Sequence, residues 1–284
     1  MGPVAAILPC GTRLHLQHGP IDLIIGADGN RQAAFAAAQG RFASVLDELV
    51  AELPLLRARV RPNSDLPKGK IARAMHDAVL PHSASYVTCM AAVAGAVADE
   101  TLAAMRAATP LRRAYVNNGG DIALYLGKGQ TFTTAMAGLN GVDLGRVTVT
   151  DRIGGIATSG AGGRSLSRGI ADAVTVLADS AAQADAAATL IANAVNVDHP
   201  GITRRPASEL HPDSDLGDLP VTVFCPTLPG SVLQIALDNG QRVANQMRHT
   251  GLIRAAAIFL QGESRLSGQT GFTPTPSHRT LVHA

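Results

Sequence analysis

The near absence of large aromatic side chains constrains this chain more than any other feature of its sequence. Its 284 residues include no Trp, 3 Tyr and 6 Phe, whereas Gly occurs 29 times and Ala 48 times. A core made from such a chain has to be filled by Ala, Val, Leu and Ile, so backbone segments must pack close to one another. Hydrophobic residues make up 46% of the chain and charged residues 16%, which excludes global disorder.

Charge and cysteine content exclude several classes of protein. The net charge of +2 is spread along the chain, so there is no basic face for nucleic acid, and the few aromatic residues provide no stacking platform for single strands. No apolar run reaches the ~18 residues of a membrane span. Cys10, Cys89 and Cys225 are widely separated, which argues against a disulfide framework or a structural zinc site. Because Met1–Cys10 lacks the basic start of a signal peptide, we expect a cytoplasmic protein.

Hydrophobic periodicity predicts a mixture of long helices and short strands. The predicted helices are Arg31–Leu53 (stopped by Pro54), Ile71–Leu80, Met90–Ala107, Ala181–Val195 and Ser231–His249. The predicted strands are Arg13–Gln17, Asp22–Gly26, Ala114–Val116, Ile122–Leu126, Thr131–Met136, Gly145–Thr150, Ala173–Ala178, Val221–Cys225 and the closing strand Ala255–Gln261.

Three other segments are predicted to be irregular: a glycine-rich loop at Ile156–Gly169, a long surface loop over 198–220, and the tail after Gly268. The pattern as a whole favours an α+β fold with antiparallel strands. We expect a single domain over residues 1–276, which could comprise two lobes, followed by an irregular tail over 277–284.

The segment Asn117-Asn118-Gly119-Gly120-Asp121 lies between two predicted strands. Two adjacent glycines let a backbone approach a ligand, and Asn and Asp tolerate the left-handed conformation that such a turn needs. Asn-Gly is equally typical of a plain hairpin turn. Both interpretations stay open on this motif alone.

A second candidate is the glycine-rich stretch over residues 154–169, which holds six glycines among hydroxyl and guanidinium side chains. Backbone N–H groups, hydroxyls and guanidinium groups all bind phosphate oxygens. The stretch matches neither the P-loop nor the dinucleotide fingerprint. It therefore predicts either a flexible surface loop or an anion site that includes Arg164 and Arg168.

Asp185 and Thr189 form the third candidate, because they lie four residues apart in a predicted helix and so share one face. Carboxylate and hydroxyl oxygens are ligands that Mg²⁺ accepts. The alternative is that Asp185 stabilises the start of its helix through its negative charge.

These motifs occur in an order that resembles the ApbE-like superfamily, whose best-known members are the FAD:protein FMN transferases. Asn117-Asn118-Gly119-Gly120-Asp121-Ile122 comes first and Thr158-Ser159-Gly160 second. Val174-Thr175-Val176 with Ala184-Asp185 and Thr189 comes third. The resemblance is good over roughly residues 114–195, and the rest of the chain looks like a shorter, cytoplasmic and poorly characterised branch.

The resemblance implies an α+β fold of the T-fold type and a joint purpose for the three motifs. It implies ligand contacts, as in an FAD site, from Asn117, Gly119, Gly120, Asp121, Thr158, Ser159 and Gly160, with Asn118 in the variable position between. It assigns Asp185 and Thr189 to a Mg²⁺ ion beside the pyrophosphate. In the transferase reaction the metal polarises that pyrophosphate, and a target hydroxyl displaces AMP.

One segment departs from the family pattern. The transferases carry His-x-x-Asp-Pro-x-Thr-Gly between the Thr-Ser-Gly turn and the Val-Thr-Val strand. Residues 161–173 here retain at most Asp172 of it. Part of the flavin-binding wall is therefore absent, and the sequence favours a phosphate-type site over one for FAD or FMN, with Arg164 and Arg168 replacing the lost segment.

Three hypotheses about function stay open. The first is an ApbE-like transferase that acts on a nucleotide or another phosphorylated or anionic small molecule. The second, implied by relatives of this branch, is a component of sulfur assimilation into homocysteine, for which Cys89 or Cys225 would matter. The third is a non-catalytic flavin- or nucleotide-binding accessory protein. The small-residue helices could also pack across a homodimer.

Overall fold

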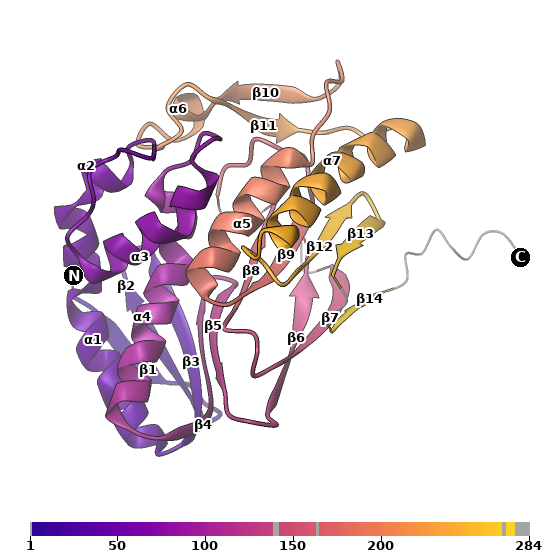
Figure 1. Ribbon diagram of the computed structural model, residues 1–284. Coiled ribbons are helices and arrows are strands. Elements are labelled where there is room, and N and C mark those ends of the chain that lie inside the picture. Colours follow the sequence, from indigo (N-terminus) through magenta and orange to yellow (C-terminus); the bar gives the residue numbers. More distant parts are fainter. Residues whose placement is uncertain (1, 139–141, 163–164, 269–270, 276–284) are drawn as a thin grey trace, which may run out of the picture. The chain divides into compact units, whose positions relative to one another are not determined.

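The computed structural model describes residues 2–138, 142–162, 165–268 and 271–275 (Figure 1). The chain forms two compact units, each assembled from segments that are distant in the sequence. The first comprises Met1–Thr131, Thr150–Ala157 and Ala178–Ala186, and the second Phe132–Val149, Thr158–Leu177 and Ala187–Ala284. Both combine helices with antiparallel strands, which confirms the α+β class. The tail predicted over 277–284 lies outside the described residues.

An antiparallel sheet forms one layer of the first unit. Its strands follow the order β1 (Val4–Ile7), β2 (Arg13–His18), β3 (Ile21–Gly29), β4 (Leu111–Asn118), β5 (Asp121–Leu126) and β8 (Gly155–Ser159). Strands β2 and β3 form the predicted hairpin around Gly19 and Pro20, with His18 paired to Ile21. Gly19 has a φ of 56°, a conformation that glycine adopts without strain.

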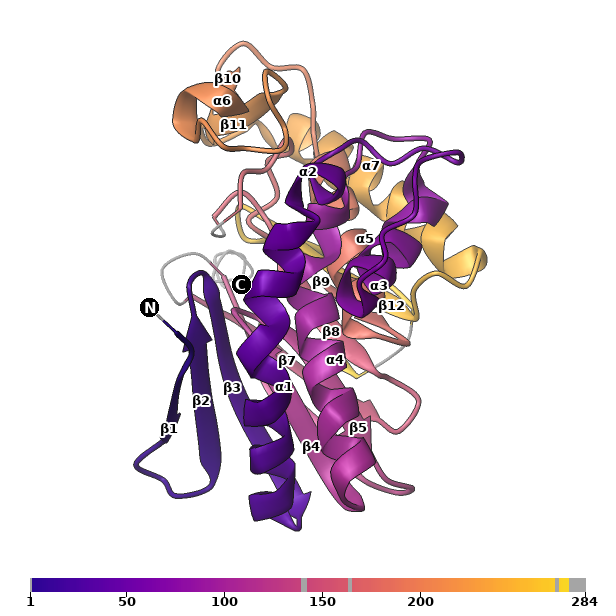
Figure 2. The same ribbon diagram turned by 90° about the vertical axis from the view of Figure 1, so that its left-hand side faces the viewer.

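The helices of the first unit pack against one face of this sheet or against one another. They are α1 (Arg31–Ala51), α2 (Leu53–Leu56), α3 (Lys70–Val79) and α4 (Val93–Ala108), with single 3₁₀ turns at Leu80–His82 and Cys89–Ala92. Figure 2 shows α1 and α4 side by side against strands β3 to β5. The Asn30 side chain starts α1 by accepting a hydrogen bond from the N–H of Ala33. Pro54 lies in the first turn of α2, where a missing N–H costs nothing.

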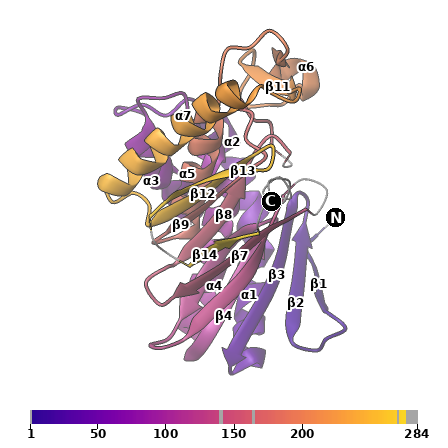
Figure 3. The same cartoon turned by 90° about the vertical axis from the view of Figure 1, so that its right-hand side faces the viewer.

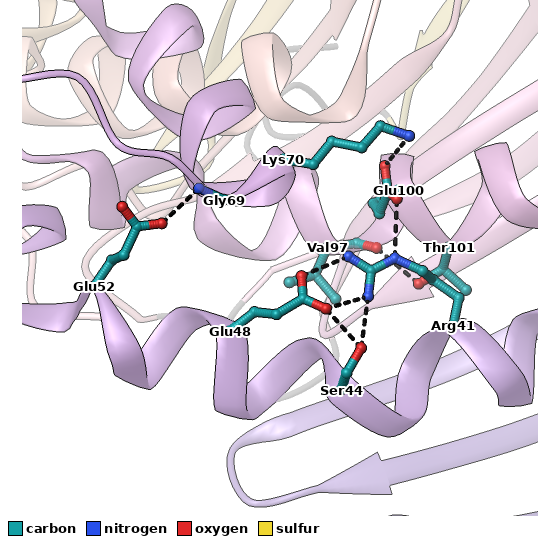
Figure 4. Close-up of polar contacts among 9 residues, drawn as sticks. All are labelled: Arg41, Ser44, Glu48, Glu52, Gly69, Lys70, Val97, Glu100 and Thr101. Carbon is teal, nitrogen blue, oxygen red and sulfur yellow. Dashed lines mark hydrogen bonds and ion pairs between the residues drawn. The ribbon is translucent and has the colours of Figure 1, made fainter.

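A polar network joins three helices of the first unit (Figure 4). Arg41 on α1 donates two hydrogen bonds to Glu48, at 2.8 and 2.7 Å, and one to Glu100 on α4 at 2.9 Å. The ammonium group of Lys70 on α3 lies 2.9 Å from the second oxygen of Glu100. Glu52 holds the turn before α3 by accepting from the N–H groups of Lys68 and Gly69. These contacts fix how the three helices pack around the apolar core.

The second unit contains three groups of antiparallel strands. They are β9 (Ala173–Ala178), β12 (Ala255–Leu260) and β13 (Glu263–Ser267); β14 (Phe272–Pro274), β7 (Asp143–Thr150) and β6 (Thr131–Ala137); and β10 (Thr203–Pro206) with β11 (Pro220–Phe224). Its helices are α5 (Ala181–Ala194), which begins in the first unit, α6 (Ala207–Leu210) and α7 (Gly230–His249). Figure 3 shows α7 lying across β12 and β13.

The cores are filled almost entirely by Ala, Val, Leu and Ile, and the buried aromatic side chains are Phe35, Phe42 and Phe259. This confirms the packing expected from the composition. Gly95 on α4 is the clearest case, because a Cβ there would collide with the backbone of Ala181 and Ala182 at the start of α5. The small-residue face of α4 therefore allows two helix ends to meet backbone to backbone.

The sequence-based assignments were wrong at four places. The predicted loop at Ile156–Gly169 begins inside strand β8, whose first residue, Gly155, packs against the backbone of Ser180 and Ala181. The predicted loop over 198–220 contains β10 and α6. Strand β12 does not close the sheet, since β13 follows it. Within the predicted irregular tail, Phe272–Pro274 pairs with β7.

Two glycine-to-alanine substitutions test the close approach of α4 and α5. Gly95→Ala is expected to destabilise the protein by about 2 kcal/mol or more, because the added methyl group displaces the backbone at Ala181. Gly40→Ala, in α1, meets nothing within 4 Å and is expected to stabilise by about 0.5–1 kcal/mol through helix propensity. Urea unfolding followed by circular dichroism measures both. Equal effects of the two variants would contradict the packing.

Candidate functional site

The Asn117–Asp121 segment is a tight hairpin between β4 and β5, with Asn118 paired to Asp121. Gly119 and Gly120 have φ values of 66° and 119°. The turn needs glycine at both positions, because other residues rarely adopt a positive φ. The N–H of Gly120 donates to the Asn117 side chain at 2.9 Å. The buried Asn118 amide donates to the carbonyl of Ala94 at 3.1 Å, so the hairpin is tied to the start of α4.

Two aspartates hold the N-termini of α4 and α5 reciprocally. Asp185 on α5 accepts a hydrogen bond from the N–H of Gly95 in the first turn of α4 at 3.0 Å. Asp99 on α4 accepts from the N–H groups of Ala181 and Ala182 at 3.0 and 2.9 Å, at the start of α5. Each helix therefore supplies the carboxylate that satisfies the free N–H groups of the other. We call these two contacts the reciprocal caps.

The reciprocal caps bring the predicted hairpin and the predicted metal ligand together. Asn118 and Asp185 bind to consecutive residues, Ala94 and Gly95, at the start of α4. The carboxylate of Asp121 is near enough for its negative charge to raise the pKa of Asp185. In the first unit, the structure thus places the hairpin residues Asn118 and Asp121 beside Asp185.

Partial burial and mutual repulsion both act on the carboxyl groups of Asp185, Asp99 and Asp121. Burial raises the pKa of Asp185 well above 3.8, and the charges of Asp121 and Asp99 raise it further, against the lowering effect of the N–H groups of Gly95 and Ala94. Burial also raises the pKa of Asp99 from 3.8 to about 6, although its two N–H donors oppose the shift. A cation placed here would relieve this repulsion.

The donor set around Asp185 fits a hard cation in part. Carboxylate oxygens are the ligands that Mg²⁺ prefers, and one to two carboxylates with phosphate and water complete its usual shell. Thr189 lies one turn further along α5, so the pair keeps the spacing of one helix face. In the portion of the chain described, no three His, Cys, Asp or Glu side chains converge to hold a metal by themselves. A Mg²⁺ ion here would thus need a phosphorylated ligand.

The Thr158-Ser159-Gly160 motif ends strand β8 in the second unit. The hydroxyl groups of Thr158 and Thr175 lie 3.0 Å apart, and a Cβ on Gly160 would collide with the backbone of Asp172. Asp172 in turn accepts a hydrogen bond from the N–H of Gln261 at 2.5 Å. Each of these contacts is made within the protein, so the motif has a structural role whether or not it contacts a ligand.

Several glycines of the 154–169 stretch are explained by packing. A Cβ on Gly154 or Gly155 would strike the backbone at 179–181, and a Cβ on Gly169 would strike the backbone of Ala192. The backbone of Arg168 is held by Asn193 and Asn196, while its Nε is buried without a partner. Arg164, the other predicted anion ligand, lies outside the described residues.

Asp99 is the residue beside the candidate site that sequence reasoning missed. It lies in the middle of an Ala-rich helix, and the N–H groups that it accepts from are 82 and 83 residues away in the sequence. No local pattern indicates such a contact. Ala94 and Gly95 were missed for the same reason, because they contribute backbone atoms whose position depends on tertiary packing.

The three free cysteines differ sharply in environment. Burial raises the pKa of Cys89 to about 11 and also raises that of Cys225, so neither thiol has the lowered pKa of a sulfur-carrying nucleophile. Exposed Cys10 is the exception. Its Sγ accepts hydrogen bonds from Arg13 and Thr12, which lower its pKa to about 6.

A family model described as "AbpE bacteria" matches residues 5–266, and the chain belongs to this family. A UPF0280 protein of Methanopyrus kandleri is 34% identical over 206 residues, covering 70% of this chain and 80% of that protein. A UPF0280 protein of Methanothrix thermoacetophila is 36% identical over 160 residues, covering 54% and 65%. The predicted membership of the ApbE-like superfamily is confirmed.

Two solved structures are also similar. The ApbE protein of Thermotoga maritima is 12% identical, covers 90% of this chain and 96% of its own, and has a TM-score of 0.48. The flavinyl transferase ApbE of Pseudomonas stutzeri is 11% identical, covers 99% and 96%, and has a TM-score of 0.45. A search of the described helices found none long and apolar enough to cross a membrane.

The raised pKa of Asp99 leads to a pH-dependent stability. In the folded protein this carboxyl binds its proton below pH ~6. In the unfolded chain it binds the proton only below pH ~4. Stability from this group therefore falls as pH rises from about 4 to 6, by up to about 3 kcal/mol for a shift of this size, and is constant above. Asp99→Asn is expected to flatten that slope in urea unfolding measured at each pH.

Asp47→Asn, at an exposed position on α1, serves as the control and should leave the slope unchanged. Because the raised pKa of Asp185 also contributes, part of the slope should remain in Asp99→Asn, and a slope between pH 4 and 6 as steep as that of the wild type would contradict the assignment to Asp99.

Alkylation rates test the cysteine environments. Cys10 is expected to react first with iodoacetamide, with a rate that rises through pH ~6, and Cys89 last. Arg13→Gln and Thr12→Val remove the two donors and should move the Cys10 profile to higher pH. Peptide mass spectrometry resolves the three sites, and the urea-unfolded chain calibrates their intrinsic rates. Equal rates for Cys10 and Cys89 in the folded protein would refute the assignment.

Proposed function

We propose that this protein binds a phosphorylated or other anionic small molecule, such as a nucleotide or flavin, together with Mg²⁺. The observation that carries the proposal is the convergence of Asn118 and Asp185 on consecutive residues at the start of α4, with Asp121 close by. The carboxylates of Asp121 in the hairpin and Asp185 in α5 therefore lie close together, beside the small residues Ala94 and Gly95 at the start of α4.

In this proposal the ion is assigned to Asp185, with Thr189 on the next turn of α5 as its second protein ligand. When bound, Mg²⁺ would neutralise and polarise phosphate oxygens. Asp185 accepts hydrogen bonds from the N–H groups of Gly95 and Ala94, which fix the orientation of its carboxylate, and its remaining lone pairs are assigned to the metal. Asp121 supplies further negative charge, which favours the binding of a divalent cation.

The ligand contacts are assigned to each unit separately. In the first unit they are the hairpin residues Asn117, Asn118, Gly119, Gly120 and Asp121. In the second unit they are Thr158, Ser159, Gly160 and Arg168, with Arg164 included from the sequence alone. The three free cysteines support the cytoplasm as the proposed compartment.

A transferase and a non-catalytic binding protein share this site and differ only in turnover. The family to which the chain belongs supports the transferase, and the missing His-x-x-Asp-Pro-x-Thr-Gly segment supports a ligand other than a flavin in the usual orientation. Product analysis after incubation with FAD, ADP or ATP and Mg²⁺ separates the two roles.

Thermal shift and calorimetry with FAD, FMN and ADP, each with and without Mg²⁺, test the proposal. At about 100 times Kd, genuine binding stabilises by roughly 2.7 kcal/mol. We expect at least one ligand to stabilise the wild type in a Mg²⁺-dependent manner. Asp185→Asn should abolish the Mg²⁺ dependence, and Asp121→Asn, which leaves the reciprocal caps in place, should weaken it.

Asp47→Asn is the matched control at an exposed carboxylate and should behave as the wild type does. If no ligand shifts the wild type, the ligand site is refuted. If Asp185→Asn is folded and keeps the full Mg²⁺-dependent shift, the metal assignment is refuted and the ligand site stands.

A further inference from the structure

Two buried polar atoms without hydrogen-bond partners lie on neighbouring segments of the second unit. They are Nε of Arg168 and Oγ1 of Thr222. The segments are neighbours because the N–H of Thr222 in β11 donates to the carbonyl of Ser167 at 2.8 Å. A buried donor without a partner costs about 1–3 kcal/mol, so two of them on neighbouring segments require an explanation.

A second guanidinium group lies next to this pair. Arg204 in β10 is the cross-strand partner of Thr222. Its Nη2 donates to the side-chain oxygen of Asn196 at 2.5 Å, and the amide of the same side chain donates to the carbonyl of Arg168 at 3.1 Å. One side-chain amide thus bridges the Arg204 guanidinium and the Arg168 backbone.

Among the described residues, no carboxylate is paired with either of these two arginines. Arg204 donates to the neutral oxygens of Asn196 and Val197, and the Arg168 backbone is held by two asparagines. Asn196 therefore holds the Arg204 guanidinium and the Arg168 backbone without neutralising either arginine.

We propose that Arg168 and Thr222 form a binding site for a tetrahedral oxyanion of the phosphate class, with Arg204 supplying additional positive charge. The Nε–H of Arg168 can only donate and the Thr222 hydroxyl can donate, so an acceptor satisfies both atoms, and guanidinium groups bind phosphate oxygens strongly. The inference deepens the proposed function and rests on it in one respect, that the ligand is anionic. It adds that the phosphate group of the ligand is recognised, and that Arg168, Thr222 and Arg204 recognise it.

Calorimetric titration of the full chain with inorganic phosphate and with pyrophosphate, in EDTA and at constant ionic strength, tests this site. We expect saturable binding to the wild type. Arg168→Gln should weaken it roughly tenfold or more, because a charged hydrogen bond is lost. Thr222→Val, which keeps the side-chain shape, should weaken it severalfold. Sulfate should compete, and acetate, which is planar, should not.

Arg205→Gln is the matched control, because Arg205 adjoins Arg204 but is exposed and paired with Glu209. It should bind phosphate as the wild type does. Circular dichroism of each variant separates loss of binding from loss of folding. Absence of saturable binding to the wild type would show that water alone fills the site, and folded Arg168→Gln with wild-type affinity would equally overturn the proposal.

The absence of Mg²⁺ from this titration keeps the two proposals apart. Phosphate binding in EDTA without any Mg²⁺-dependent ligand shift would support the oxyanion site and reject the metal assignment. A Mg²⁺-dependent shift without phosphate binding in EDTA would reject the oxyanion site alone.

Discussion

The reciprocal caps are the interaction on which the rest of the first unit depends. Each of two helices begins inside the protein, where its first N–H groups would otherwise lack partners, and each receives a carboxylate from the other. The contact requires glycine at position 95, because any larger residue would separate the two helix starts. The predicted helix over Met90–Ala107 is divided at Val93 into a 3₁₀ turn and α4, and the N–H of Gly95 in the first turn of α4 donates to Asp185.

The same contact links stability to the candidate site. Asp185 and Asp99 are half-buried with Asp121 nearby, and partial burial raises the pKa of both capping carboxyls. A protein that needed only helix caps could use Ser or Asn, which carry no charge. Retaining two half-buried carboxylates close together costs stability at neutral pH, and a bound cation would offset that cost. The caps therefore support the metal proposal as well as the fold.

How far the sequence predicted this protein depended on the range of the contact involved. Local patterns identified the hairpin at Gly19–Pro20, the hairpin at Asn117–Asp121 and the long helices, because periodicity and turn residues act over a few positions. They missed Asp99, whose partners are more than 80 residues away, and they missed β10, β14 and the beginning of β8. Glycines 154 and 155 were interpreted as parts of a loop, although they serve backbone packing that only tertiary structure reveals.

Hydrogen exchange at four backbone amides tests the central role of the reciprocal caps most directly. Amides in the first turn of a helix exchange quickly when only water accepts from them. We expect the N–H groups of Ala94, Gly95, Ala181 and Ala182, resolved by NMR, to be protected as strongly as core amides of α4. Fast exchange at these four positions, in a protein whose α4 interior is protected, would contradict the account.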